Sequence, residues 1–265
     1  MECSPIFMNA TDLSKAIRSK KISCREVMEA FLAQIDLMNP AVNAIVCLQE
    51  RDGLLAQADE RDAQLMRGEY CGVMHGFPLA VKDLAATKGI VTSQGSPLLA
   101  DFVPNADAIV VERMKASGAI IIGKTNTPEF GLGSNTYNNV YGITANAYDN
   151  TKTAGGSSGG AAVSIALKMQ PVADGSDMMG SLRNPAAYNN VYGMRPSIGL
   201  VPMGPAPEVF LQQFATEGPM GRTVEDVALL LSVQAGYDAR APLSLRVDGS
   251  VFAQGLSSNV AGMKV

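Results

Sequence analysis

The chain has 265 residues, of which 47% are apolar and 17% are charged, and its net charge is -4. The apolar fraction excludes an intrinsically disordered chain, and no apolar run approaches the ~20 residues of a membrane-spanning helix. The weak negative charge argues against direct binding to nucleic acid or to an anionic membrane surface. We therefore expect a soluble protein with a small-molecule ligand.

The thiols and the single imidazole narrow the chemistry further. Cys3, Cys24, Cys47 and Cys71 lie far apart without a C-x-x-C pair, which predicts reduced, mostly buried thiols in a cytoplasmic protein. No basic and apolar leader segment is visible at the start of the chain. His75 is the only histidine, so a site with several histidine ligands is excluded and neither a metal nor a cofactor is expected.

Residues 1–70 have a helical pattern. Ser23 and Glu26 form a capping-box signature, and behind it an apolar stripe recurs every four residues at Val27, Phe31 and Ile35. We expect this helix to stop at Asn39-Pro40, because proline interrupts helical hydrogen bonding. A second helix is predicted over about residues 49–66.

From His75 onward, short apolar strands alternate with helices. The expected strands are 77–81, 118–122 and 171–173, and the expected helices are 107–117, 160–169 and 223–234. This alternation predicts an α/β fold with a mixed or largely parallel central sheet flanked by helices. Residues 203–214 are interpreted as a loop that either flanks a pocket or covers the core.

Residues 118–125 match the P-loop expression G-x-x-x-x-G-K-[ST]. A phosphate-binding loop needs a polar, looping middle whose N–H groups surround phosphate. Here the middle is Ala119 followed by three isoleucines, which itself reads as a strand, with Lys124 and Thr125 expected past its end. We therefore interpret the match as a buried strand, and nucleotide hydrolysis is only a weak alternative.

Two glycine-rich segments suggest nucleophilic catalysis. The first, residues 153–160, places Ser157 and Ser158 between glycines that permit unusual backbone conformations. In the second, residues 174–185, Ser181 follows a glycine between a strand and a helix, a position that exposes a serine hydroxyl. A serine nucleophile needs a base, and either His75 or Lys82 could supply it.

Six segments together resemble the amidase signature family, hydrolases that use a Ser-Ser-Lys triad. They are HGFPLAVKD (75–83), GAIIIGKTNTPEF (118–130), AGGSSGG (154–160), GSDMMGSLR (175–183), GMRPSIG (193–199) and GPMGRTVED (218–226). The likeness extends from about Phe7 to Val265. Six segments in the same order are far more specific than any one of them.

The resemblance implies a role for each matching residue. Ser181 corresponds to the nucleophile, Ser157 to a bridging serine after a cis peptide bond from Gly156, and Lys82 to the base. His75 corresponds to a position without a catalytic role and is expected to be structural.

The resemblance also implies which groups surround the substrate. The oxyanion hole corresponds to the backbone N–H groups of Met178, Met179, Gly180 and Ser181. Gly131 and Ser158 correspond to substrate-binding positions. Met179 stands where the family usually has a second glycine.

Family domains are about twice as long as this chain. We therefore expect residues 1–265 to form one truncated domain, with a helical segment at 1–70, a catalytic core at 75–235 and a connection at 236–265 that leads into an unfinished strand near 260–265. The leading hypothesis is an amidase that acts on a small amide. A glutaminase-type A subunit of a tRNA amidotransferase and an inactive family member are the alternatives, and a homo-oligomer is left open.

Overall fold

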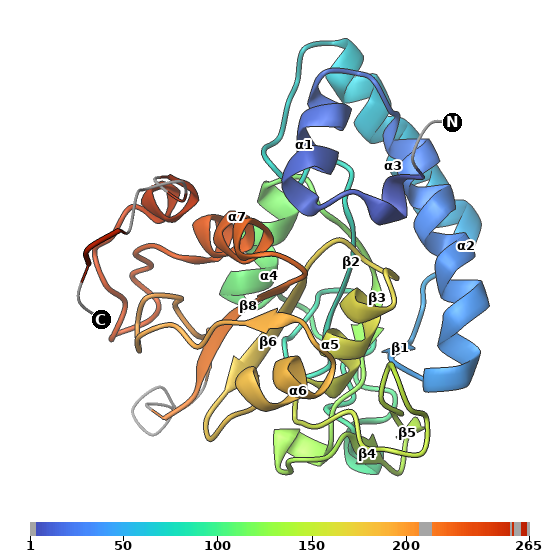
Figure 1. Cartoon of the computed structure of the whole chain (residues 1–265), viewed down its shortest axis with the longest axis vertical. Helices are drawn as coiled ribbons and strands as arrows, with labels where there is room; N and C mark the ends of the chain where they lie inside the picture. The colour runs from blue at the N-terminus through green and yellow to red at the C-terminus, as the bar shows by residue number, and fades with distance from the viewer. Residues whose placement is uncertain (1–3, 207–213, 255, 257–260, 264–265) are drawn as a thin grey trace.

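The computed structural model describes residues 4–206, 214–254, 256 and 261–263. In this part of the chain, no helix is long and apolar enough to cross a membrane. After the short 3-10 helix η1 (Pro5–Phe7), three helices form the N-terminal segment: α1 (Ala10–Arg18), α2 (Cys24–Val42) and α3 (Arg51–Met66). Figure 1 shows these blue helices gathered on one side of the molecule, away from β6 and β8.

The capping box at the start of α2 is confirmed. Ser23 Oγ accepts a hydrogen bond from the Glu26 N–H at 3.1 Å, and Glu26 Oε2 accepts one from the Ser23 N–H at 2.8 Å. These contacts satisfy donors that the first helical turn leaves unpaired. The predicted apolar stripe is also buried, and α2 packs against α3.

The predicted end of α2 at Asn39-Pro40 is wrong, because the helix continues to Val42 with Pro40 in its last turn. The chain leaves the helix at Asn43, whose φ of 51° is left-handed. The Asn39 side chain accepts hydrogen bonds from the N–H groups of Ala44 at 2.9 Å and Ile45 at 2.8 Å. Asn39 therefore fixes the turn that follows the helix.

The first sheet has the order β1-β3-β2, from β1 (Ile45–Val46), β3 (Ile120–Thr125) and β2 (Pro78–Lys82). β2 and β3 are parallel, whereas β1 is antiparallel to β3. All the residues of these three strands are buried. The sheet lies in the interior, and Lys82 stands at the end of β2.

The other strands form two antiparallel sheets. One has the order β6-β8-β7, from β6 (Ala173–Asp177), β8 (Thr216–Gly221) and β7 (Tyr192–Gly193), and the other pairs β4 (Tyr137–Asn138) with β5 (Gly142–Ile143). The remaining helices are η2 (Pro97–Leu99), α4 (Ile109–Ala116), η3 (Glu129–Gly131), α5 (Gly159–Ala166), α6 (Arg183–Tyr188), α7 (Val224–Gln234) and η4 (Gly249–Ala253).

The predicted mixed α/β class is confirmed, but a largely parallel sheet is wrong. Among the described strands only β2 and β3 pair in parallel. Side chains, rather than backbone pairing, join β2 to the segment that contains β6. The Ala80 N–H donates to Gln170 Oε1 at 2.8 Å, and the Lys82 N–H donates to the Asp174 carboxylate at 3.1 and 3.2 Å.

Two strand predictions need correction. β3 extends through Lys124 and Thr125, so these residues do not lie past the strand end, and the strand predicted at 171–173 is β6, which starts at Ala173. Lys124 is buried and its Nζ donates to Ala85 O at 2.6 Å and to Thr87 Oγ1 at 2.9 Å. These internal partners agree with the rejection of a phosphate-binding loop.

The cysteines and the C-terminal residues also depart from expectation. Of the three described cysteines, Cys24 is buried, Cys47 is partly buried and Cys71 is exposed, so mostly buried thiols are not observed. All three are free thiols. The predicted strand near 260–265 lies largely outside the described residues, and Ala261 and Gly262 form a turn.

Close backbone packing around α5 generates a stability prediction. A Cβ at Gly160 would lie 2.4 Å from Asn126 N and 2.6 Å from Ala44 O, whereas a Cβ at Gly53 in α3 would have no atom within 4 Å. We expect Gly160→Ala to lower the free energy of unfolding by about 1–3 kcal/mol through overpacking. The matched change Gly53→Ala should raise it by about 0.5–1 kcal/mol. Urea denaturation measures both, and a Gly160→Ala chain as stable as the wild type would contradict this packing.

Candidate active site

The site is built around the side chain of Lys82, the last residue of β2. Lys82 is 1% exposed. The hydrogen bonds from its N–H to Asp174 fix the end of the strand next to β6. The side-chain amine of Lys82 therefore lies in the interior, between the two larger sheets.

Three serine hydroxyls surround the amine. Lys82 Nζ lies 2.8 Å from Ser157 Oγ, 2.8 Å from Ser158 Oγ and 2.9 Å from Ser176 Oγ. Ser157 and Ser158 come from the loop before α5, and Ser176 comes from β6. Within the described part of the chain, no carboxylate oxygen lies within salt-bridge distance of this amine.

Burial lowers the pKa of Lys82 to about 7, and nearby Asp174, Glu217 and Asp177 only partly oppose that effect. The desolvated ammonium form is costly because hydroxyl groups replace only part of its hydration. A substantial fraction of the amine is therefore neutral near neutral pH, and a neutral amine can accept a proton.

The glycines around the serine pair allow this loop to approach other backbone segments closely. Gly155 has a φ of 74°, and the Gly156–Ser157 peptide bond is cis, as the resemblance implied. A Cβ at Gly156 would lie 2.9 Å from Asn135 N. No side chain fits there without a shift, which explains a glycine at this position.

Ser181 lies in the turn between β6 and α6, and Asp177 shapes this turn. The Asp177 carboxylate accepts hydrogen bonds from the N–H groups of Gly180 at 2.8 Å and Leu182 at 3.2 Å, and it forms ion pairs with Arg183 and Arg195. Burial raises the pKa of Asp177, but these donors outweigh it and hold the pKa well below its usual range. Asp177 therefore stays ionised and keeps the turn closed.

The backbone donors of this turn differ from the expected oxyanion hole in one respect. The Gly180 N–H donates to Asp177, so it is already occupied. The N–H groups of Met178, Met179 and Ser181 have no acceptor among the described residues. Three of the four expected donors therefore remain available to a ligand.

The side chain of Met179 points away from the site. It is 87% exposed and does not line the cavity described next. The left-handed backbone conformation in this turn belongs to Gly180, whose φ is 119°. Met179 therefore replaces a glycine without strain and without filling the site.

A cavity of about 460 Å³ opens onto these groups. Ser157, Ser176 and Ser181 contribute hydroxyl groups to its lining, and apolar side chains such as Phe130 and Leu132 supply much of the rest. Ser181 Oγ has no hydrogen-bond partner among the described residues, although Ser181 O accepts from the Ser158 N–H at 3.2 Å. The structure thus brings the three predicted catalytic side chains to one place.

The two expected substrate-binding residues lie in different environments. Gly131 lines the cavity. Ser158 does not line it and is fully buried, with its hydroxyl contacting Lys82 Nζ and Ser176 O. The structure therefore places Gly131 at the cavity and Ser158 behind its wall, in contact with the amine.

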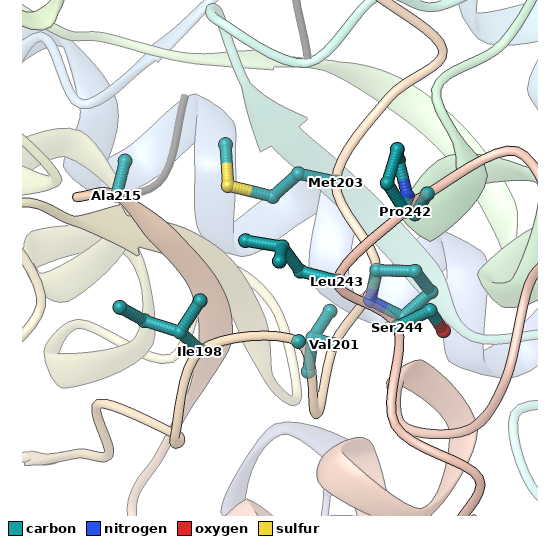
Figure 2. Close-up of a pocket in the computed structure, with 10 residues that line it drawn as sticks. Ile198, Val201, Met203, Ala215, Pro242, Leu243 and Ser244 are labelled. Atoms are coloured by element: carbon teal, nitrogen blue, oxygen red, sulfur yellow. The ribbon is translucent and has the colours of Figure 1, made fainter. Parts of the chain in front are cut away.

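In the loop interpreted over residues 203–214, residues 203–206 line the cavity, whereas Phe214 is exposed and does not line it. Residues 207–213 lie outside the described residues. Val201 and Leu243 line a second, smaller hollow (Figure 2), whose volume is about 40 Å³. Met203 and Ala215 line both this hollow and the main cavity. The pocket-flanking interpretation of this loop therefore holds for its first residues.

Glu217 is a cavity residue that the sequence patterns did not indicate. It lies in β8 opposite Ser176 of β6, and it lines the same cavity as Ser157 and Ser181. Burial raises the pKa of Glu217 to about 8. An acidic residue inside an otherwise uncharged strand, residues 216–221, was the only available signal.

His75 has partners away from this cavity, as expected for a structural residue. Its Nδ1 accepts from the Cys71 N–H at 3.2 Å, and its Nε2 lies 2.9 Å from Arg61 O. Its ring stacks on Tyr70 with centroids 5.5 Å apart. Of the two candidate bases, Lys82 is thus the one at the serines. Across the described ranges, no group of three or more His, Cys, Asp or Glu side chains could hold a metal ion.

Comparison with known proteins adds independent evidence. A family model described as Amidase matches residues 26–265. An acylamidase from Rhodococcus erythropolis is 37% identical over 259 residues, which cover 98% of this chain and 54% of that protein. The A subunit of glutamyl-tRNA(Gln) amidotransferase from Acaryochloris marina is 39% identical over 257 residues, which cover 96% of this chain and 52% of that protein.

Solved structures show the same likeness. A bacterial aryl acylamidase of the amidase signature family superposes with a TM-score of 0.87 and 37% identity, over 92% of this chain and 51% of that one. A peptide amidase from Stenotrophomonas maltophilia gives a TM-score of 0.83 and 32% identity, over 90% and 50%. The chain spans about half the length of the curated relatives it matches. Because the family model covers most of its residues, the chain belongs to the amidase signature family.

Proposed function

We propose that this chain carries the acylation site of an amidase, which hydrolyses a small carboxylic amide to an acid and ammonia or an amine. The observation that carries the proposal is the contact of 2.8 Å between the buried Lys82 Nζ and Ser157 Oγ, beside the cavity that Ser157 shares with Ser181. In this proposal Ser181 is the nucleophile, Ser157 is the bridge and Lys82 is the base. These roles match the order in which the three side chains lie, from the cavity to the buried amine.

In the first half of the reaction, neutral Lys82 accepts the proton of Ser157 Oγ. Ser157 in turn accepts the proton of Ser181 Oγ, which attacks the amide carbonyl carbon. A tetrahedral intermediate forms with negative charge on the former carbonyl oxygen. The unoccupied N–H groups of Met178, Met179 and Ser181 are the candidate donors to that oxygen.

In the second half, the proton held by Lys82 returns through Ser157 to the leaving nitrogen as the C–N bond breaks. Ser181 is then esterified by the acyl group. Water attacks this ester, again losing a proton through Ser157 to Lys82. The acid leaves, and the proton returns to Ser181 Oγ, which restores the site.

A second candidate function has a specific observation in its favour. Several relatives are A subunits of glutamyl-tRNA(Gln) amidotransferase at 38–39% identity, among them proteins from Acaryochloris marina and Alkaliphilus metalliredigens. In that case the same triad would release ammonia from glutamine for partner subunits. Glutaminase activity together with co-purification of two further subunits would favour this alternative over a free-standing amidase.

A third alternative is an inactive family member, in which Met179 blocks the oxyanion site. The exposed Met179 side chain and the positive φ at Gly180 argue against this alternative.

The remaining expectations enter as parts of the proposal. Residues 1–265 form one domain in which 1–70 support the 75–235 core, and 236–265 form a connection. The free thiols of Cys24, Cys47 and Cys71 favour a cytoplasmic location. The substrate is a small-molecule amide. A homo-oligomer, in which the partner is a second copy of the chain, stays open.

The proposed triad predicts the reactivity of Ser181 toward a fluorophosphonate probe. The wild-type chain should be labelled on Ser181, and Ser181→Ala should abolish labelling. Lys82→Ala and Ser157→Ala should each slow labelling at least about 100-fold, because each removes one step of the proton relay. Mass spectrometry of the labelled peptide measures the rate and the site.

Two surface variants serve as matched controls for this experiment. Lys88→Ala and Ser197→Ala make the same chemical changes at exposed positions and should label like the wild type. Circular dichroism establishes that each variant is folded. If folded Lys82→Ala and Ser157→Ala chains label at the wild-type rate, the triad assignment fails.

The lowered pKa of Lys82 also predicts the pH dependence of labelling. The neutral amine is the reactive form, so the rate should rise with pH through about 7 and level off above that. An amine with the ordinary value of 10.5 would instead give a rate that still rises steeply at pH 9 to 10. A labelling profile with that late rise would contradict the lowered pKa of Lys82.

A further inference from the structure

Glu217 is the one acidic side chain among the described residues that line the cavity, and no basic side chain lines it there. The other residues in the wall are Ser157, Ser176 and Ser181, Gln94 and a set of apolar residues. The proposed reaction uses no carboxyl group at this position. A carboxyl group in this wall without a task in the reaction calls for another partner, since a polar group left unpaired inside a protein is costly.

The strand register places Glu217 on the reacting side of its sheet. Glu217 of β8 and Ser176 of β6 stand directly opposite each other in the antiparallel pair. Side chains of such a pair lie on the same face, with Cβ atoms ~4.5–5.5 Å apart. Ser176 Oγ contacts Lys82 Nζ at 2.9 Å, so the Glu217 side chain also faces the amine and the serines.

Among the described residues, the Glu217 carboxyl group has neither a hydrogen-bond partner nor an ion-pair partner. Oε2 is buried and lacks a hydrogen bond, and no described residue donates a hydrogen bond to Oε1. Neither oxygen forms an ion pair with a described side chain, and Lys82 Nζ is already surrounded by its three hydroxyls. A buried acceptor left unpaired is costly, and a donor on a ligand would recover that cost.

We propose that Glu217 is a specificity-determining residue that binds an ammonium group of the substrate. The site would then take carboxylic amides that carry a positively charged amino group, and this inference rests on the amidase function proposed above. An ammonium group supplies both the hydrogen-bond donors and the positive charge that the carboxylate lacks. The apolar wall accommodates the carbon chain between the amide and the amino group.

The charged groups near Glu217 favour the binding of a cationic ligand. Burial and Asp174 raise the pKa of Glu217, and Lys82 and Lys124 oppose this rise only in part. Without ligand the carboxyl group therefore keeps its proton near neutral pH. An ammonium ligand favours the carboxylate, so its binding releases this proton to solvent.

The test uses two series of fluorophosphonate probes with alkyl arms of increasing length, which end in either an ammonium or a methyl group. Both series react at the same phosphorus atom, so the ratio of their rates cancels any effect on Ser181 or Lys82. At the best arm length the wild-type chain should prefer the ammonium probe roughly 10-fold to 100-fold, as for a charge-assisted hydrogen bond. Glu217→Gln should reduce this preference to near unity.

Glu225→Gln is the matched control, because it removes an exposed carboxylate from α7 and should keep the wild-type preference. If Glu225→Gln abolishes the preference as well, the effect is a general attraction to an acidic protein and the inference is overturned. A wild-type chain that labels with both series at equal rates overturns it too, while the amidase proposal stands. If Glu217→Gln does not fold, the ratio of the two labelling rates in the wild-type chain still tests whether the site prefers an ammonium group. Absence of all Ser181 labelling would instead refute the amidase proposal and the inference with it.

Discussion

The burial of one lysine amine among hydroxyl groups is the interaction on which the rest of the site depends. Lys82 Nζ contacts three serine oxygens and no carboxylate among the described residues. Burial lowers its pKa to about 7, and the carboxyl groups farther away oppose this shift only in part. A carboxylate in place of any of the three serines would hold the proton on the amine and remove the base.

The surrounding fold keeps this arrangement in place with contacts that do not themselves react. Asp174 holds the backbone of Lys82, and Asp177, with its two arginine partners, holds the turn that presents Ser181. Glycines let the serine-pair loop and α5 pack directly on neighbouring backbone. The carboxylates thus orient peptide groups around the site and leave the amine without an ion pair.

Local sequence signals were sufficient to select the residues that the structure places together, because each lies in a distinctive segment. Ser157 sits in a glycine-rich turn, Ser181 in another, and Lys82 at the end of an apolar strand, so six short motifs were sufficient for the family. The sequence analysis missed Glu217, because its place in the cavity wall depends on the cross-strand pair with Ser176, which no local pattern reveals. The continuation of α2 past Pro40 was missed because the sequence pattern did not show that the Asn39 side chain hydrogen-bonds the backbone of Ala44 and Ile45 and so fixes the turn after the helix.

The state of the Lys82 amine tests the account most directly. Lysine labelled with ¹³C at Cε allows an NMR titration of the whole chain, with the Lys82 signal identified by its loss in Lys82→Arg. We predict that this signal titrates with a midpoint near 7, since burial favours the neutral amine. A midpoint close to the ordinary lysine value of 10.5 would show an ammonium group at neutral pH and contradict the proposed base.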